Sequence, residues 1–180
     1  MKVYIIRHWQ NNTNIRNKLL GVEDEDINSV GKLQSKQVKE VLNNVKIDVC
    51  FTSPLKRTRH TASIICENNI PMIIDERLVE RGFGSLEGGS YNEKYTHDFW
   101  NYYLNKNDYG VEPLQDLFFR TQSFLEYLKN NYIDKTILIV SHAATIRAYI
   151  LILWVLIKRQ ICCRLLLIMD KFLSMTFKGE

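Results

Sequence analysis

The chain is poor in glycine, proline and paired cysteine. Its 180 residues include only 8 Gly and 3 Pro, and 11% are aromatic, which excludes collagen-like, low-complexity and disordered classes. None of the four cysteines forms a closely spaced pair typical of zinc ligands, so we expect no metal and no other cofactor. Cys50 and Cys66 lie in apolar segments. We interpret them as reduced core residues, which favours a cytoplasmic location.

Long apolar runs and a strong charge of one sign are also missing. Residues 148–157 are apolar throughout, but Lys158 and Arg159 end the run at about half the ~20 residues that a spanning helix needs. The apolar run near the N-terminus is too short for a signal peptide. A formal net charge of +4 is too small to argue for nucleic acid. We therefore expect a buried helix at residues 148–157, and neither a membrane nor a nucleic acid as partner.

The composition is that of a globular protein with one core. A chain of this length buries roughly 70% of the surface that its unfolded form exposes. No repeat and no linker rich in Pro, Gly or Ser marks a boundary. We therefore predict a single domain over residues 1–180.

Short apolar segments alternate with amphipathic ones along the chain. Strands are predicted at residues 2–6, 47–52, 72–74 and 135–140, with 164–169 as a further candidate. Helices are predicted at residues 28–42, 53–68, 91–104, 113–130 and from 143 onward. Asn28 and Ser53 are the expected caps, with Pro54 as the first helical residue. The first of these helices is expected to bury Val30, Leu33, Val38, Val41 and Leu42. This alternation predicts an α/β three-layer sandwich, with a mostly parallel central sheet and helices on both faces.

Charged and polar side chains follow three of the predicted strands. In parallel α/β sheets, ligands bind at the carboxyl ends of the strands. This edge receives Arg7 and His8 after the first strand, residues 53–57 after the second, and Ser141 with His142 after the fourth. Arginine supplies forked donors for phosphate or carboxylate, and helix N-termini add backbone N–H groups. The sequence therefore predicts an oxyanion site at this edge.

Four sequence blocks then point to a family. Arg7-His8 precedes Asn14, and Gly21, Asp24, Gly31 and Gln34 follow at characteristic spacings. The other blocks are Ser53-Pro54-Leu55-Lys56-Arg57 with Thr61-Ala62, the segment 75–88 with Arg77-Leu78, Glu80, Phe83-Gly84 and Glu87-Gly88, and Ser141-His142. Over roughly residues 1–150 these blocks, in this order, resemble the histidine phosphatase superfamily, also called phosphoglycerate-mutase-like. Among phosphatases they resemble the α-ribazole and broad-specificity enzymes.

The resemblance implies a role for each candidate residue. His8 is the implied nucleophile, which would form a phosphohistidine. The implied phosphate ligands are Arg7, Asn14, Gly21, Arg57 and His142. Glu80 is the implied general acid, because its spacing from Arg77-Leu78 and Phe83-Gly84 fits, although Glu76 and Glu87 lie close by. His60 and His97 are interpreted as surface residues.

Several positions depart from the family pattern. Trp9 stands where the family usually has glycine after the first histidine, so its side chain must point out of the pocket or narrow it. Gln10 and Asn11 replace Glu and Thr, and Ala143 replaces the usual Gly after the second histidine. Beyond Arg147 the resemblance fades.

Three functions compete. The first is a metal-independent phosphomonoester hydrolase acting on a small molecule, either as a monomer or as a homodimer. The second is a phosphoglycerate mutase. Mutases of this family are longer between the acid block and the second histidine, where this chain has about 60 residues, which favours hydrolysis. The third is a non-catalytic module that binds a phosphorylated ligand, and it rests on Trp9 and on the unusual C-terminal segment.

Overall fold

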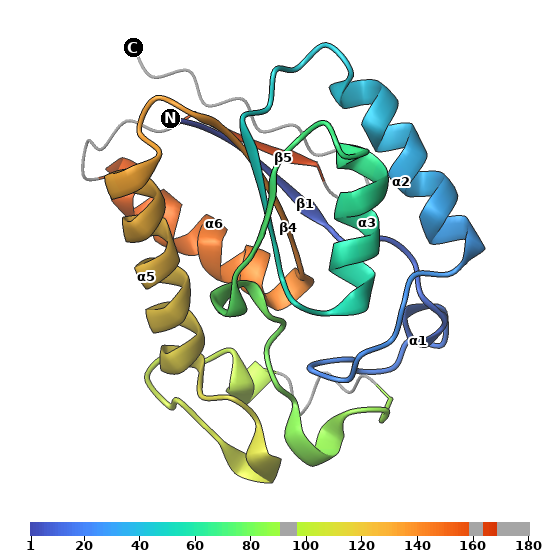
Figure 1. Cartoon of the computed structure of the whole chain (residues 1–180). Helices are drawn as coiled ribbons and strands as arrows, with labels where there is room; N and C mark the ends of the chain where they lie inside the picture. Colours follow the sequence, from blue (N-terminus) through green and yellow to red (C-terminus); the bar gives the residue numbers. More distant parts are fainter. Residues whose placement is uncertain (91–96, 159–163, 169–180) are drawn as a thin grey trace.

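The computed structural model describes residues 1–90, 97–158 and 164–168 (Figure 1). At its centre is a five-stranded sheet with the order β3-β2-β4-β1-β5, and all its pairings are parallel. The strands are β1 (Lys2–Arg7), β2 (Val49–Thr52), β3 (Met72–Ile74), β4 (Thr136–Ser141) and β5 (Arg164–Ile168). The helices are α1 (Asn12–Ile15), α2 (Ser29–Leu42), α3 (Lys56–Cys66), α5 (Leu114–Asn131) and α6 (Ala143–Lys158). Short 3-10 turns are η1 (Glu76–Leu78), η2 (Gly84–Leu86) and η3 (Asp108–Gly110).

The two faces of the sheet bury separate cores. Side chains alternate between the faces of a strand, so neighbouring residues of β1 such as Ile5 and Ile6 belong to different clusters. On one face β1, β2 and β4 pack against α5 and α6, and on the other against α2 and α3 (Figure 1). The predicted three-layer α/β sandwich is confirmed.

The strand register brings the predicted site residues to one edge. Arg7 at the end of β1 is paired with Ser141 at the end of β4, and Thr52 at the end of β2 is paired with Val140. His8, Ser53 and His142 therefore follow neighbouring strands at the same edge. The segment 164–168, a candidate strand from the sequence, is β5 and is paired with β1.

The predicted buried face of α2 is confirmed at Val38 and Leu42 but wrong at the other three positions. Val30, Leu33 and Val41 are exposed, and Gly31 and Ser35 are buried in their place. Small residues turn inward because the backbone comes close here: a Cβ on Gly31 would collide with the carbonyl oxygen of Gln10. The predicted cap is confirmed, since the Asn28 side chain accepts from the N–H of Gly31 at 2.9 Å.

The predicted start of α3 is also wrong. The helix begins at Lys56, and its N-cap residue, Leu55, offers no capping side chain. Asp24, which is distant in sequence, accepts from the backbone N–H of Lys56 at 2.6 Å. This contact satisfies a helix N–H that the expected cap, Ser53, leaves open.

The helix expected at residues 148–157 lies within α6, but its predicted burial is wrong at Leu151 and Trp154, which are exposed. Cys50 and Cys66 are free and buried, and His60 and His97 are exposed. Of the helix predicted at residues 91–104, residues 97–99 are helical and turns follow, while 91–96 lie outside the described residues. Among the helices that the structure describes, none has the length and apolarity needed to cross a bilayer.

Candidate active site

His8 follows β1 and is held by both its backbone and its ring. Its N–H donates to the Ser141 carbonyl at 2.9 Å, and only 4% of the residue is exposed. Nδ1 lies 2.9 Å from the Trp9 carbonyl oxygen. A carbonyl can only accept, so Nδ1 carries the proton and Nε2 of the neutral ring has the lone pair. Burial, Arg57 and Arg7 hold the pKa of His8 well below its usual value. His8 is therefore neutral at physiological pH, with a nucleophilic Nε2.

His142 lies next to His8 at the neighbouring strand end, with ring centroids 5.1 Å apart. Its Nδ1 accepts from Nε of Arg57 at 3.2 Å, so its proton is on Nε2. That N–H donates to the Ser53 hydroxyl oxygen at 2.8 Å. Burial lowers the pKa of His142 well below its usual value, and His8 and Arg57 lower it further. The two histidines thus have opposite tautomers, each set by its partner.

Arg57 lies in the first turn of α3 and is fully buried. Besides contacting His142, its Nη2 donates to the Gly21 carbonyl at 2.6 Å and its Nη1 to the Glu23 carbonyl at 2.7 Å. A guanidinium carries five N–H groups. Within the described part of the chain, these three contacts leave two N–H groups for an anion.

Glu80 reaches the same cluster from the segment after η1. Its carboxylate accepts from the backbone N–H groups of Arg81, Ala144 and Thr145 at 2.9–3.3 Å, and so caps the N-terminus of α6. Burial raises the pKa of Glu80 above its usual value, against the opposing effects of these N–H groups and of Arg57. A raised pKa favours a carboxyl group that holds a proton to donate.

The two other candidate acids, Glu76 and Glu87, differ from Glu80 in their surroundings. Glu76 is exposed on η1. Glu87 accepts from three backbone N–H groups, those of Val22, Glu23 and Phe83, at 3.0–3.1 Å. Of the three neighbouring acids, Glu80 is the one bonded to the backbone that directly follows His142, close enough to Arg57 and Arg7 for both to lower its pKa.

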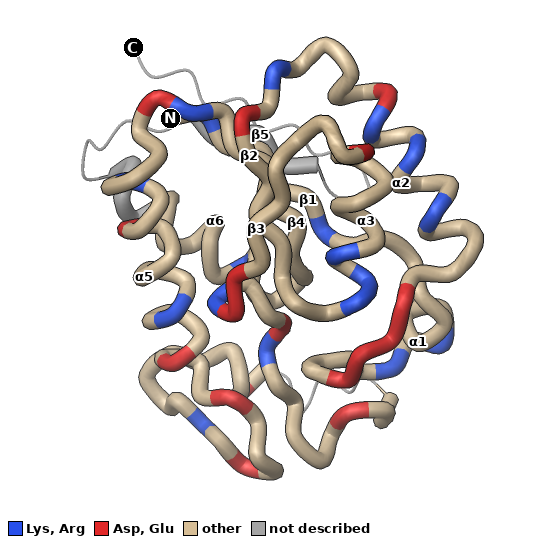
Figure 2. Tube along the Cα trace, viewed as in Figure 1, with Lys and Arg blue, Asp and Glu red and all other residues tan. Residues whose placement is uncertain are grey.

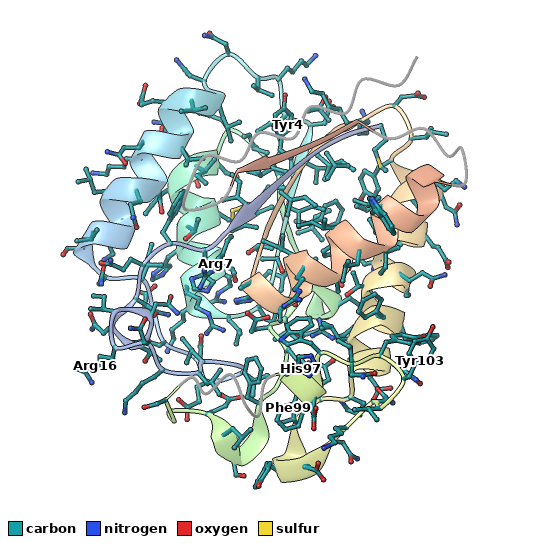
Figure 3. The ribbon with its side chains drawn as sticks, turned by 180° about the vertical axis from the view of Figure 1, so that it is seen from behind. Tyr4, Arg7, Arg16, His97, Phe99 and Tyr103 are labelled. Carbon is teal, nitrogen blue, oxygen red and sulfur yellow. The ribbon has the colours of Figure 1, made fainter. Side chains whose placement is uncertain are left out.

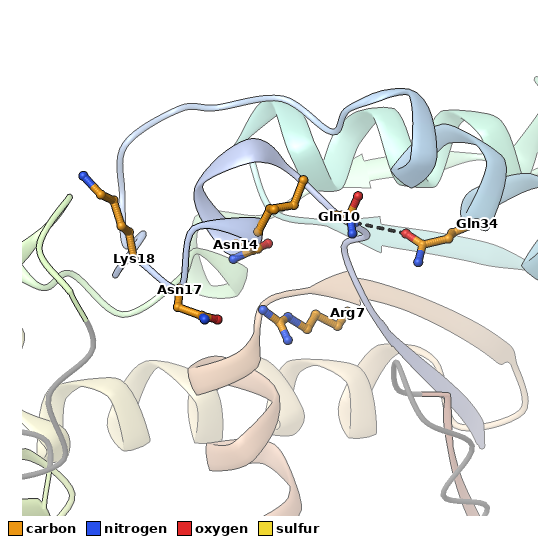
Figure 4. Close-up of a pocket in the computed structure, with 7 residues that line it drawn as sticks. Arg7, Gln10, Asn14, Asn17, Lys18 and Gln34 are labelled. Atoms are coloured by element: carbon orange, nitrogen blue, oxygen red, sulfur yellow. Dashed lines mark hydrogen bonds between the residues drawn. The ribbon is translucent and has the colours of Figure 1, made fainter.

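Arg7 and Asn14 line an adjoining pocket of about 750 Å³ (Figure 4). The other lining residues are Gln10, Ile15, Asn17, Lys18 and Gln34, so among the described residues the lining contains two cations and no acid. Arg7 lies in the interior at the end of β1, whereas Arg16 at the end of α1 points outward (Figure 3). Four acids, residues 23–26, run beside α1 outside this lining (Figure 2). The pocket thus adjoins the buried cluster at Arg7.

The sequence also matches a known family. Residues 3–158 match the model of the histidine phosphatase superfamily (branch 1). The chain belongs to the histidine phosphatase superfamily. It is therefore an enzyme of the histidine phosphatase type, and the family acts on small phosphorylated substrates.

Individual relatives carry both phosphatase and mutase names. Phosphoserine phosphatase 1 of Hydrogenobacter thermophilus is 32% identical over 82% of this chain and 74% of its own. A 2,3-bisphosphoglycerate-dependent phosphoglycerate mutase of Cytophaga hutchinsonii is also 32% identical, over 80% and 73%. The solved alpha-ribazole phosphatase of Shigella flexneri is 26% identical, with a TM-score of 0.69 over 91% of this chain and 81% of that chain. The resemblance seen in the sequence is confirmed.

Trp9, the largest departure from the histidine phosphatase pattern, points away from the site. Its indole is 9% exposed and packs in the core beside Tyr4, Ile6 and Val38, under α2. Only its backbone faces the site. The carbonyl oxygen accepts from Nδ1 of His8 at 2.9 Å, and the N–H donates to the Thr61 hydroxyl at 3.5 Å. The side chain therefore neither blocks nor narrows the pocket. The hypothesis that the protein is a non-catalytic binding module loses its main support.

Two histidine phosphatase motif residues make contacts that the sequence did not predict. Gly21, which was expected to bind phosphate, lies beside another expected phosphate ligand: its carbonyl oxygen accepts from Nη2 of Arg57 at 2.6 Å. Ser53 was expected to cap a helix, and its hydroxyl oxygen does accept from the N–H of Leu55 at 3.3 Å, just before α3. The same oxygen also accepts from Nε2 of His142 at 2.8 Å, which the sequence did not predict. Because Ser53 directly follows a buried strand, the sequence could have predicted its place at the edge of the sheet that carries the site. The prediction considered Ser53 only as a helix cap.

Proposed function

We propose that this histidine phosphatase hydrolyses phosphomonoesters through a phosphohistidine on Nε2 of His8. The observation that carries the proposal is the contact between His8 Nδ1 and the Trp9 carbonyl, which leaves the lone pair on Nε2. A neutral, oriented imidazole surrounded by buried donors is an activated nucleophile.

The first half-reaction uses the site as follows. Nε2 of His8 attacks phosphorus, the bond from phosphorus to the ester oxygen breaks, and that oxygen takes the proton of Glu80. Nδ1 keeps its proton and its bond to the Trp9 carbonyl. Arg7, Arg57 and His142 hold the charge on the phosphoryl oxygens, with Asn14 as a neutral donor. The two arginines supply the positive charge, so the reaction needs no metal ion.

The second half-reaction returns the enzyme to its starting state. The carboxylate of Glu80 takes a proton from water, the water oxygen attacks phosphorus, and the bond from phosphorus to Nε2 breaks. The electron pair returns to Nε2. Inorganic phosphate leaves and Glu80 is again protonated.

The pocket at Arg7 supports a small-molecule substrate. A volume of about 750 Å³ is typical of sites that take a whole metabolite rather than phosphate alone. Its lining, as far as the structure describes it, has two cations, four amide side chains and no acid, which favours a polar alcohol part that carries negative charge. The phosphoserine named for one relative has a carboxylate of this kind, next to an ammonium group.

The test is turnover of p-nitrophenyl phosphate by the wild type, with and without EDTA. Labelled substrate quenched in alkali preserves a phosphohistidine for mapping. We expect undiminished turnover in EDTA and label on Nε2 of His8. Absence of turnover, label on another residue, or loss in EDTA that one divalent ion restores would each overturn the proposal.

Mutase activity is the second candidate, favoured by the mutase-named relative at 32% identity. A mutase returns the phosphoryl group to an alcohol, whereas a hydrolase passes it to water. Incubation with 3-phosphoglycerate and catalytic 2,3-bisphosphoglycerate separates the two. Formation of 2-phosphoglycerate faster than release of phosphate would establish the mutase.

A further inference from the structure

We propose that Glu87 is a positioning residue for Arg57, acting through the loop at residues 21–23. The inference rests on the proposed function in one respect: Arg57 must bind the phosphoryl group. Glu87 itself does not line the described pocket, and its role is to hold the loop that orients the guanidinium.

The carboxylate of Glu87 fixes the loop through both of its oxygens. Oε1 accepts from the Val22 N–H at 3.0 Å and Oε2 from the Glu23 N–H at 3.1 Å. Oε1 also accepts from Phe83 at 3.1 Å, within its own segment. A Cβ on Gly21 would collide with Oε1, so glycine permits this approach. Charge-assisted bonds of this kind are stronger than neutral ones.

The same loop presents its carbonyls to Arg57. The oxygens of Gly21 and Glu23 accept from Nη2 and Nη1. The peptide group between Gly21 and Val22 is therefore bonded on both sides, to Arg57 through C=O and to Glu87 through N–H. In a planar trans peptide these two groups point in opposite directions. Fixing the N–H with Glu87 thus fixes the direction of the carbonyl that holds the guanidinium.

The loop needs this support because Val22 and Glu23, which follow the buried Gly21, are exposed to solvent. Val22 is 51% exposed, and both of the bonds from this loop to Glu87 lie at the surface. Arg57, in contrast, is fully buried. An unsupported loop would let the guanidinium turn, and a displacement of about 1 Å can lower turnover by as much as roughly 10²-fold.

The test replaces Glu87 and compares it with an exposed acid of the same block. Gln at position 87 keeps one acceptor oxygen but turns an NH₂ group toward a backbone N–H. We expect Glu87→Gln to weaken vanadate binding and to lower kcat/KM by roughly 10- to 100-fold. Glu76→Gln, on exposed η1, is the matched control and should change neither. Glu87→Asp keeps the charge with a shorter reach, and we expect an intermediate loss.

Two readouts distinguish positioning from a general loss of structure. The first is the NMR signal of the Arg57 Nε–H, which should shift and exchange faster in Glu87→Gln than in Glu76→Gln. The second is a double-mutant cycle: in an Arg57→Ala background, Glu87→Gln should cost no further vanadate affinity. An unchanged Arg57 signal would overturn the inference. So would losses of vanadate affinity from Glu87→Gln and Arg57→Ala that add in the double mutant. A wild type without turnover would instead count against the proposed function, and the NMR signal would still decide the role of Glu87.

Discussion

The buried cluster and the rim of the neighbouring pocket are built in opposite ways. His8, Arg57 and His142 are at most 4% exposed, and each is held by a hydrogen bond to another part of the chain. Asn17 and Lys18 at the rim are exposed. The groups assigned to the chemistry are thus fixed before a substrate arrives, while the groups around the rest of the substrate can adapt.

This difference separates rate from selectivity. The side chains of a preorganised cluster need not reorganise during the reaction. Substitutions that disturb their arrangement should therefore lower the rate strongly. Exposed side chains at a rim contribute small, screened interactions. Substitutions in the two regions should therefore differ by orders of magnitude in effect.

The largest effect is expected at His8. His8→Ala removes the proposed nucleophile, and we expect turnover to fall by roughly 10⁴-fold or more, with loss of the alkali-stable label. His97→Ala is the control, because that side chain is 86% exposed. Full activity of His8→Ala would refute the covalent mechanism.

Glu80 should show an effect that depends on the substrate. General acid catalysis typically contributes 10²–10⁴-fold, and a good leaving group needs little of it. Glu80→Gln should slow alkyl phosphates by a factor in that range and p-nitrophenyl phosphate far less. Parallel kinetics on both esters measure this difference. Equal losses of rate on the two esters would indicate that another group donates the proton.

Trp9 tests whether the core beneath the cluster matters for stability. Trp9→Ala removes a side chain that is 9% exposed, and we expect a loss of about 3–5 kcal/mol in the free energy of unfolding. Trp154 on α6 is half exposed, so Trp154→Ala should cost less than about 1 kcal/mol. Urea denaturation measures both. If Trp9→Ala left stability intact and only widened the substrate range, the indole would lie over the pocket instead.

Lys18 should give the smallest effect. An exposed charge contributes about 0.2–1 kcal/mol, so Lys18→Ala should raise KM for a phosphate ester bearing a carboxylate by at most about fivefold. The effect should vanish in high salt and be absent for an uncharged ester. Lys32→Ala, at an exposed position of α2 outside the pocket lining, is the control. A salt-independent loss on both esters would contradict this assignment.

The sequence predicted what depends on periodicity and on strand ends. The sheet, its helices and the gathering of Arg7, His8, Arg57 and His142 at one edge follow from alternation and from the rule for parallel strands. The failures share a different cause. Gly31 and Ser35 face inward on α2 because of how closely a distant backbone approaches.

Contacts between distant segments explain the remaining failures at the site. Asp24 caps α3 from 32 residues away, and Ser53 is turned toward a histidine 89 residues later. Trp9 occupies a family glycine position because only its backbone faces His8. Such contacts leave no periodic trace in the local sequence.

The position of β1 in the sheet has a consequence for how the protein is made. Its neighbours are β4 and β5, which begin at residues 136 and 164, so the strand that carries His8 is translated long before the strands on either side of it. Pairings between such distant segments form slowly. A chain still on the ribosome, with β4 not yet synthesised, has His8 but lacks His142 and the strand that positions it. The proposed phosphoryl transfer can therefore begin only after His142 has been synthesised and β4 has paired with β1.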